Sequence, residues 1–534
     1  MHNIETIFLL LLFVSVLAVF SHKINFPFPI LLVLAGLAIS LVPGLPVIEL
    51  KPEIVFLLFL PPLLYSAAWN TSWKDFKANL RPISLAAIGL VLFTTCLVAW
   101  VAHTYLPGFG WPEAFLLGAI VAPPDAAAAT SVTKGLGLHP RTITIIEGES
   151  LLNDASALIA YKYALAALAT GNFILWKAGV DFVWVSAAGI VIGLIVGYIL
   201  YLVHKFIVDD PVMETVLTLL TPFLSYILAE HLHVSGVLAV VVAGLFLSSK
   251  SSKIFSHFTR LQAVSVWKTV IFILEGMVFI LIGLQLRQVI VTIQDYEITQ
   301  LIVYGLGISF VVMLLRFIWV FPAAYLPRWL SKKIREREKT FSYKYVIIFS
   351  WAGMRGVVSI AAAMAIPLTL ASGTVFPNRD IILFLTFSVV IFTLVFQGLT
   401  LPWVIKWLNV KPYSSVEEEN IIRRRVASAA IVYIEENLSM GELTEDILAR
   451  IKTKYELRID KLSQTEIVLD NGAVHNQADR IFHLFNTAQI NLIKTEREVL
   501  EKLRNDGSVN EEVLRKLEYE LDLEEARLML ERHS

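Results

Sequence analysis

The sequence has little charge and almost no cysteine. Charged residues make up 17% of its 534 residues, hydrophobic residues make up 56%, and Cys96 is the single cysteine. A disulfide within the chain is therefore excluded, and oxidative folding has no role. Long apolar runs separated by short polar segments indicate a protein that crosses a lipid bilayer many times.

Several motifs of energy coupling and hydrolysis are also missing. The sequence contains no Gly-x-x-x-x-Gly-Lys-Ser/Thr phosphate-binding loop, no Gly-x-Ser-x-Gly elbow and no zinc-protease motif. ATP-driven pumping and hydrolysis lack their usual machinery, so we do not expect an enzyme. We expect a protein driven by an ion gradient, with no cofactor and no nucleic-acid partner.

Charge divides the chain into two regions. Up to residue 410, Lys and Arg outnumber Asp and Glu by 26 to 20, whereas in the remainder acidic residues outnumber basic ones by 25 to 18. We predict an all-α transmembrane domain over residues 1–410 and a helical cytoplasmic tail over residues 411–534. Leucines at helical spacing favour a tail that packs on itself or on a dimer mate, and a regulatory role is the alternative.

Apolar runs of about 20 residues predict about thirteen membrane spans. The predicted ranges are 4–21, 27–43, 51–68, 82–105, 111–134, 142–168, 179–204, 212–231, 235–249, 265–286, 298–324, 344–370 and 380–405. With the N-terminus outside, the loops that fall inside hold most of the Lys and Arg residues, as the positive-inside rule requires. An odd number of spans then places the tail in the cytoplasm of a multi-pass plasma-membrane protein.

Two of these spans are interrupted. The fifth contains two prolines just before Asp125, and the twelfth contains glycines on both sides of Arg355. Broken helices expose backbone groups at membrane depth, which is tolerated only where they line a site. A shift of seven spans relates the two breaks, and the same shift relates the similar segments 29–37 and 237–245. Because an odd shift reverses direction across the membrane, this pattern indicates inverted repeats.

Acidic residues inside apolar runs are the strongest functional signal. Glu149 and Asp154 lie in the sixth span and Asp125 lies in the fifth, although a charge at mid-membrane costs about 2.5–3.5 kcal/mol on insertion scales. Asp154 is the first candidate for a transport site, because one carboxylate can hold a proton or a small cation but not both. The candidate further ligands of a monovalent cation are oxygens of neighbouring groups, namely Asp125, Asn153, Ser150 and the Pro124 carbonyl.

Glu149 and Arg355 are predicted to form a structural ion pair, because each alone would be an uncompensated buried charge. Arg316, also deep in a span, is the alternative partner of Glu149. Glu275 lies deep in a span without an assigned role, and Glu147 is expected near the entry of its helix without a transport role.

The segment 147–154, with the sequence EGESLLND, closely resembles the Gly-Glu-Ser-Leu-Leu-Asn-Asp signature of the cation:proton antiporter-1 family, the sodium/proton exchangers of bacteria and animals. The segment 353–356, GMRG, resembles the Gly-x-Arg-Gly motif of that family. Segments 60–64 and 229–236 are also similar to family segments. The resemblance covers residues 1–410 and not the tail.

This resemblance implies thirteen spans in two inverted six-helix repeats, and a homodimer. It implies that Asp154 binds Na⁺ or H⁺ in turn, that crossing broken helices carry Asp125 and Arg355, and that Glu149 bridges to the arginine. With Asn153 before the aspartate, it also implies electroneutral exchange of one cation for one proton.

Two departures from the family pattern concern the ligands. Asp125 is followed by Ala126, where the family often has proline, and the acid that many members carry after the Leu-Pro-Pro segment is replaced by residues 65–68, YSAA. Because one ligand that the family pattern implies is absent, the preference between Na⁺, K⁺ and Li⁺ is open.

We therefore predict a secondary antiporter that exchanges cytoplasmic Na⁺ for external H⁺ by alternating access and serves pH homeostasis. A K⁺/H⁺ antiporter on the same scaffold is the first alternative. A cation channel would pass current without moving protons, and a non-transporting receptor would leave the acidic cluster around Asp154 without a role.

Overall fold

The computed structural model describes residues 2–24, 26–42, 55–133, 136, 138–170, 175–207, 210–255, 257–293, 297–337, 342–370 and 374–410, with isolated positions beyond residue 427. The chain divides into two compact units, residues 1–413 and residues 414–534. The predicted helical tail lies almost entirely outside the described residues. The helices that position the candidate site all belong to the first unit.

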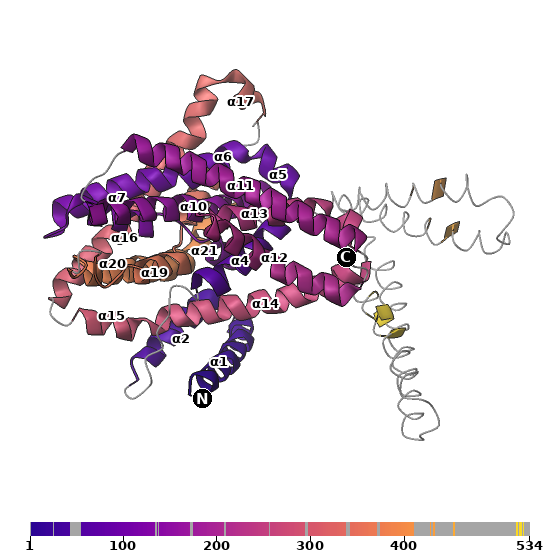
Figure 1. Ribbon diagram of the computed structural model, residues 1–534, viewed down its shortest axis with the longest axis horizontal. Helices are drawn as coiled ribbons and strands as arrows, with labels where there is room; N and C mark the ends of the chain where they lie inside the picture. The colour runs from indigo at the N-terminus through magenta and orange to yellow at the C-terminus, as the bar shows by residue number, and fades with distance from the viewer. Residues whose placement is uncertain are drawn as a thin grey trace. The chain divides into compact units, whose positions relative to one another are not determined.

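This unit is built from helices (Figure 1). The described ranges contain no β-strand, and one isolated bridge joins Thr369 to Val375. The helices of the first half are α1 (His2–Ile24), α2 (Phe28–Ser40), the π-helix η1 (Val55–Phe59), α4 (Leu60–Asn70), α5 (Trp73–Ala78), α6 (Leu80–Ser84), the π-helix η2 (Leu85–Leu90), α7 (Val91–Tyr105), α8 (Trp111–Val121), α9 (Ala126–Thr133) and α10 (Pro140–Thr170).

The second half continues in the same way. Its helices are α11 (Leu175–Phe206), α12 (Pro211–His231), α13 (Gly236–Ile254), α14 (His257–Leu284), α15 (Leu286–Thr292), α16 (Ile298–Leu330), α17 (Lys332–Arg337), α18 (Tyr343–Trp351), α19 (Val357–Met364), α20 (Arg379–Phe392), the π-helix η3 (Thr393–Gln397) and α21 (Gly398–Trp407). Local sequence features explain where several of these helices begin. The Asp210 carboxylate accepts from the Met213 N–H at 2.9 Å at the start of α12, and Pro211 occupies the first position, where no donor is needed.

Seven helical stretches in the described ranges are long and apolar enough to cross a membrane. They are Leu80–Tyr105, Trp111–Thr133, Ala178–Phe206, Pro211–His231, Gln262–Leu284, Ile298–Leu330 and Arg379–Trp407. α10, although 31 residues long, is not among them, because it carries several charged side chains in an otherwise apolar sequence. The helical membrane class is therefore confirmed, and the count of thirteen spans stays a prediction.

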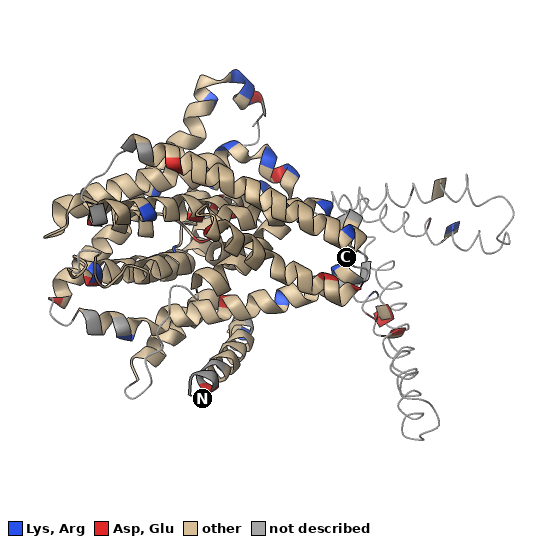
Figure 2. Ribbon diagram, in the orientation of Figure 1, with Lys and Arg blue, Asp and Glu red and all other residues tan. Residues whose placement is uncertain are grey.

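α10 lies inside the bundle and contacts α8, α9, α13 and η2. Figure 2 shows acidic positions in the middle of the bundle, whereas Lys and Arg positions lie mostly toward its periphery. Glu149, Asn153 and Asp154 of α10 are therefore enclosed by protein, whereas Lys162 on the same helix is exposed.

Close helix packing in this bundle depends on glycine. α2 contacts α14, and a Cβ atom added at Gly36 would meet the Ile280 carbonyl oxygen, while one added at Gly283 would meet the Val33 carbonyl oxygen. Small residues at such contacts let two helix backbones approach closely, which is a common way for membrane helices to associate.

Replacing Gly36 with alanine should therefore lower the free energy of unfolding by about 1–3 kcal/mol, the usual cost of overpacking. The control is Gly307→Ala in α16, where an added Cβ atom would meet no atom within 4 Å. Chemical denaturation in detergent micelles measures both variants. Equal stability of the two would contradict this role of Gly36.

Candidate functional site

Both predicted helix breaks occur, and they meet. α8 ends at Val121 and α9 begins at Ala126, while α18 ends at Trp351 and α19 begins at Val357. The Asp125 N–H donates to the Met354 carbonyl oxygen at 2.7 Å, so the two extended segments are joined through their backbones. Backbone groups that have no hydrogen-bond partner within their own helix thus find one in the other break.

Arg355 is fully buried at this crossing and binds backbone oxygens. Its Nε donates to the Val121 carbonyl at 3.0 Å and its Nη2 to the Ala122 carbonyl at 3.2 Å, while Nη1 donates to the Gly353 carbonyl. The carbonyls at the end of a helix have no partner within that helix. Arg355 therefore closes the C-terminal end of α8 at membrane depth.

Asp125 begins the helix on the other side of the break. Its Oδ1 accepts from the Ala127 N–H at 2.8 Å, as a carboxylate does at a helix N-terminus. Gly356 lies directly against this side chain, since a Cβ atom added there would meet Asp125 Oδ2 and Cγ. One carboxylate oxygen of Asp125 is thus used for capping, and the other lies at the crossing of the two breaks.

α10 is tied to the break by two polar residues. The Asn153 side-chain amide donates to the Pro124 carbonyl at 2.7 Å, and the Ser150 hydroxyl accepts from the Ala126 N–H at 3.3 Å. Asn153 is fully buried, and its Oδ1 has no hydrogen-bond partner among the described residues. Four of the five predicted ligand groups therefore form one cluster, with Asp154 beside them in the next position of α10.

Asp154 is 6% exposed and lines a cavity of about 270 Å³. Asp125, Ser150 and the residues of both breaks line the same cavity, and the two aspartates are close enough to interact electrostatically. The structure thus brings together the site residues that the sequence predicted.

Two further acidic residues that were not assigned to the site also line this cavity, namely Glu147 and Glu275. The interpretation of Glu147 as a plain helix-entry residue therefore needs correction. Glu147, Ser150 and Asp154 are spaced by three and four residues and share one face of α10. This spacing could have predicted from the sequence that Glu147 lies near Asp154. Nothing in the local sequence of α14 predicts that Glu275 lies near these residues.

Glu149 pairs with Arg316, the alternative that the sequence left open, and not with Arg355. Both guanidinium Nη atoms of Arg316 donate to the two Glu149 carboxylate oxygens at 2.7 Å, and both side chains are almost fully buried. Arg316 also donates to the Phe349 carbonyl from Nε and Nη2, each at 3.2 Å. The pair therefore joins α10, α16 and α18. The hydrogen bonds of Arg355 go instead to backbone carbonyls, those of Val121, Ala122 and Gly353.

The site offers hard oxygen ligands, which suit a small monovalent cation and, on the carboxylates, a proton. Among the described residues no group of three or more His, Cys, Asp and Glu side chains converges as a tight metal centre would require. A pair of carboxylates that lines a cavity, with neutral oxygens around it, fits a cargo that enters and leaves.

Comparison with known proteins gives a consistent result. The family model for the sodium/hydrogen exchanger, transmembrane, matches residues 8–407. An uncharacterized Na⁺/H⁺ exchanger of Mycobacterium tuberculosis is 32% identical over 518 residues, which cover 96% of this chain and 93% of that protein. A sodium, potassium, lithium and rubidium/H⁺ antiporter of Bacillus subtilis is 31% identical over 521 residues, which cover 95% of this chain and 76% of that protein.

A solved structure has a similar fold. The sodium proton antiporter MjNhaP1 from Methanocaldococcus jannaschii superimposes with a TM-score of 0.60 at 20% identity. The match covers 77% of this chain and 99% of that chain. At this identity the likeness concerns the fold alone.

Replacing Glu149 with glutamine should lower the free energy of unfolding by about 3–5 kcal/mol, because it leaves the buried Arg316 without a charge partner. The matched control is Glu230→Gln, whose partner Lys162 lies 3.5 Å away in an exposed pair, and which should cost less than about 1 kcal/mol. Denaturation in detergent compares the two. A cost for Glu149→Gln no larger than that of the control would contradict a structural role of the pair.

Proposed function

The chain belongs to the sodium/hydrogen exchanger family, and we propose that it exchanges Na⁺ for H⁺ by alternating access, with Asp154 holding the two in turn. The observation that carries the proposal is a nearly buried carboxylate that lines a cavity where two broken helices cross. Such a residue is costly in a membrane and is retained where it serves transport.

Competition at one carboxylate would couple the two ions. A proton on Asp154 removes the negative charge that a cation needs, and a bound cation disfavours protonation of the same group. Release of one is then required for binding of the other, so neither ion crosses without the exchange. In this scheme the site changes sides only when it is loaded.

The neighbouring oxygens would complete the shell of the cation. Asn153 is held by its amide on the Pro124 carbonyl, and its Oδ1 is buried with no partner among the described residues. Pro124 lines the cavity and Asn153 does not, so Asn153 would act on the cation by fixing this carbonyl. Ser150 and the second oxygen of Asp125 lie on the adjoining segments. If Asp154 alone changes its protonation, as the family resemblance implies for a site with asparagine at position 153, one cation replaces one proton without net charge. Glu147 and Glu275 would raise the local concentration of cations in the cavity.

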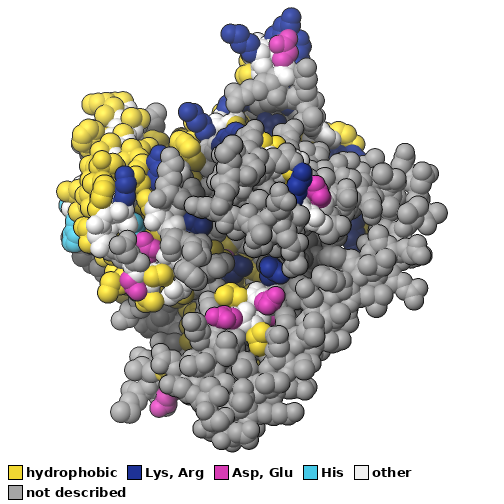
Figure 3. All heavy atoms as spheres, turned by 90° about the vertical axis from the view of Figure 1, so that its right-hand side faces the viewer, with side chains coloured by type: hydrophobic (Ala, Val, Ile, Leu, Met, Phe, Trp, Pro, Cys, Tyr) yellow, Lys and Arg dark blue, Asp and Glu magenta, His cyan; other side chains and the backbone are white. Residues whose placement is uncertain are grey.

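Topology enters the proposal as well. The breaks at α8–α9 and α18–α19 lie seven predicted spans apart and meet, which supports two inverted six-helix repeats with thirteen spans. A homodimer is proposed from the family resemblance alone. Lys332, Lys333 and Arg335 are exposed on α17, and Figure 3 shows this projecting basic segment at the top of the view. We place this segment and the tail in the cytoplasm and the N-terminus outside the plasma membrane.

The second candidate function is exchange of other monovalent cations, such as K⁺, for H⁺. The names of the relatives favour it. Relatives at similar identity are named as Na⁺/H⁺ exchangers and as sodium, potassium, lithium and rubidium/H⁺ antiporters. K⁺/H⁺ exchange on the same site is therefore the alternative. Proton flux in vesicles after separate additions of Na⁺, K⁺ and Li⁺ distinguishes the two.

Asp154→Asn should abolish Na⁺-driven proton flux in proteoliposomes while the protein still folds, because asparagine holds neither a proton nor a negative charge. The control Asp75→Asn, at an exposed position of α5, should exchange at the parent rate. Flux of the Asp154 variant at the parent rate would contradict the proposal.

Competition also sets the pH dependence. Because protons and Na⁺ share Asp154, lowering the pH should raise the Na⁺ concentration that gives half-maximal exchange. In the range where the carboxyl group is mostly protonated, the rise approaches tenfold per pH unit, and the maximal rate at saturating Na⁺ falls much less. Initial rates at several pH values measure this. A half-maximal Na⁺ concentration that stays constant while only the maximal rate falls would indicate separate sites.

A further inference from the structure

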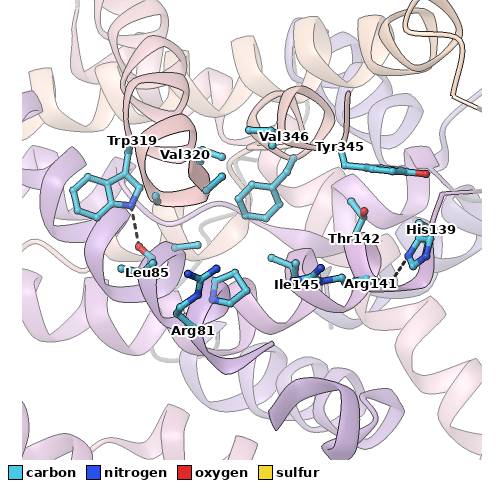
Figure 4. A pocket seen from close by; sticks show the side chains of 15 residues that line it. Arg81, Leu85, His139, Arg141, Thr142, Ile145, Trp319, Val320, Tyr345 and Val346 are labelled. Atoms are coloured by element: carbon cyan, nitrogen blue, oxygen red, sulfur yellow. Dashed lines mark hydrogen bonds between the residues drawn. The ribbon is translucent and has the colours of Figure 1, made fainter. Parts of the chain in front are cut away.

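A second cleft, of about 100 Å³, lies between η2, α10, α16 and α18, and Asp154 does not line it. Its walls are mainly hydrocarbon, supplied by Leu85, Ile145, Trp319, Val320, Val346 and Phe349. Figure 4 shows Trp319 and Leu85 at one end of the cleft and His139 and Tyr345 at the other. The cation site described above makes no use of it.

Two arginines stand along this cleft, Arg81 from α6 and Arg141 from the first turn of α10, and His139, which precedes α10, lines it as well. Figure 4 shows the guanidinium group of Arg81 directed into the cleft. Arg141 is oriented by its Nε, which donates to Asn79 Oδ1 at 2.8 Å. Of the described residues that line the cleft, none is acidic. The cleft therefore joins apolar walls to a region of positive charge.

The walls are fixed by contacts of their own. The Trp319 indole donates to the Leu85 carbonyl at 3.0 Å and packs directly on Gly89, where an added Cβ atom would meet the ring. Phe349 is buried, its ring lies 4.7 Å from the Arg316 guanidinium, and its carbonyl accepts from Arg316. An occupant would thus contact the residues that hold the Glu149–Arg316 pair, so its binding should stabilise the fold.

The cleft also borders the surface that faces lipid. Ile318 and Tyr325 of α16 are 49% and 42% exposed, and they alternate along the helix with the lining residues Trp319 and Ala324. In a membrane protein, exposed apolar side chains of a spanning helix contact acyl chains. The helix that lines the cleft therefore also presents a face to lipid.

From these observations we infer that the cleft binds an anionic phospholipid of the surrounding bilayer, with its phosphate at Arg81 and Arg141 and part of one acyl chain between η2, α16 and α18. Guanidinium groups are well suited to phosphate. A free phosphate ion would leave the apolar walls unused, and a zwitterionic lipid would bring a second, positive charge beside the arginines. The anionic lipid satisfies both parts of the cleft.

The test uses the full-length protein in detergent micelles and measures the midpoint of thermal unfolding against added lipid. Dioleoylphosphatidylglycerol should raise the midpoint in a saturable way, whereas dioleoylphosphatidylcholine and inorganic phosphate should not. The double variant Arg81→Gln/Arg141→Gln should raise the half-saturating concentration by about tenfold or more, because each basic residue near a lipid surface contributes about 1 kcal/mol.

The matched control is Lys332→Gln/Arg335→Gln on α17, which removes the same charge at exposed positions outside the cleft and should change that concentration less than twofold. If loss of the Asn79 contact prevents folding of the arginine variant, Ala323→Phe keeps both arginines, fills the cleft and should abolish saturable binding. Equal effects of the two double variants, an equal response to inorganic phosphate, or unchanged binding by Ala323→Phe would each overturn the inference. Exchange is not measured, so failure here leaves the antiport proposal standing.

Discussion

Backbone groups that two helix breaks release inside a membrane must find partners in the protein, and the rest of the structure depends on how they do so. Arg355 supplies donors to the carbonyls at the end of α8, and the Asp125 N–H pairs with the Met354 carbonyl. A break in lipid without such partners would cost several kcal/mol for each unsatisfied group. Because these bonds satisfy the break, an irregular and polar segment can exist inside the helix bundle, which is where the proposed function places the transported ion.

The structure separates a buried ion pair, Glu149 with Arg316, from Asp154, the carboxylate that the proposed function assigns to exchange. Arg316 and Glu149 neutralise each other in a buried bidentate pair that joins α10, α16 and α18. Asp154, five residues further along α10, has no such cation among the described residues and faces the cavity instead. A carboxylate that forms an ion pair with an arginine of the protein would bind a mobile cation only weakly, because the arginine already neutralises its charge. Under the proposed function, leaving Asp154 without a resident cation is what makes exchange possible.

Much of this was predictable from the sequence, and the parts that were not have a common physical cause. Apolar run length predicted the helical membrane class, and the prolines before Asp125 and the glycines around Arg355 predicted both breaks, because these are local properties of the chain. Glu149 was predicted to pair with Arg355, whereas the structure pairs it with Arg316, since the partner depends on which of two distant arginines the packing of helices brings near. The cavity position of Glu147 follows from helical spacing, whereas that of Glu275 on α14 depends on packing between helices.

One carboxylate shared between sodium ion and proton is the centre of the proposed mechanism. Adding Na⁺ to purified protein in weakly buffered solution, with a pH indicator present, tests it most directly. The account predicts saturable release of up to one proton per protein chain, greatest where Asp154 is protonated beforehand, and no release from a variant that lacks this carboxylate. Binding of Na⁺ without any release of protons across the range of pH in which the protein is folded would contradict it.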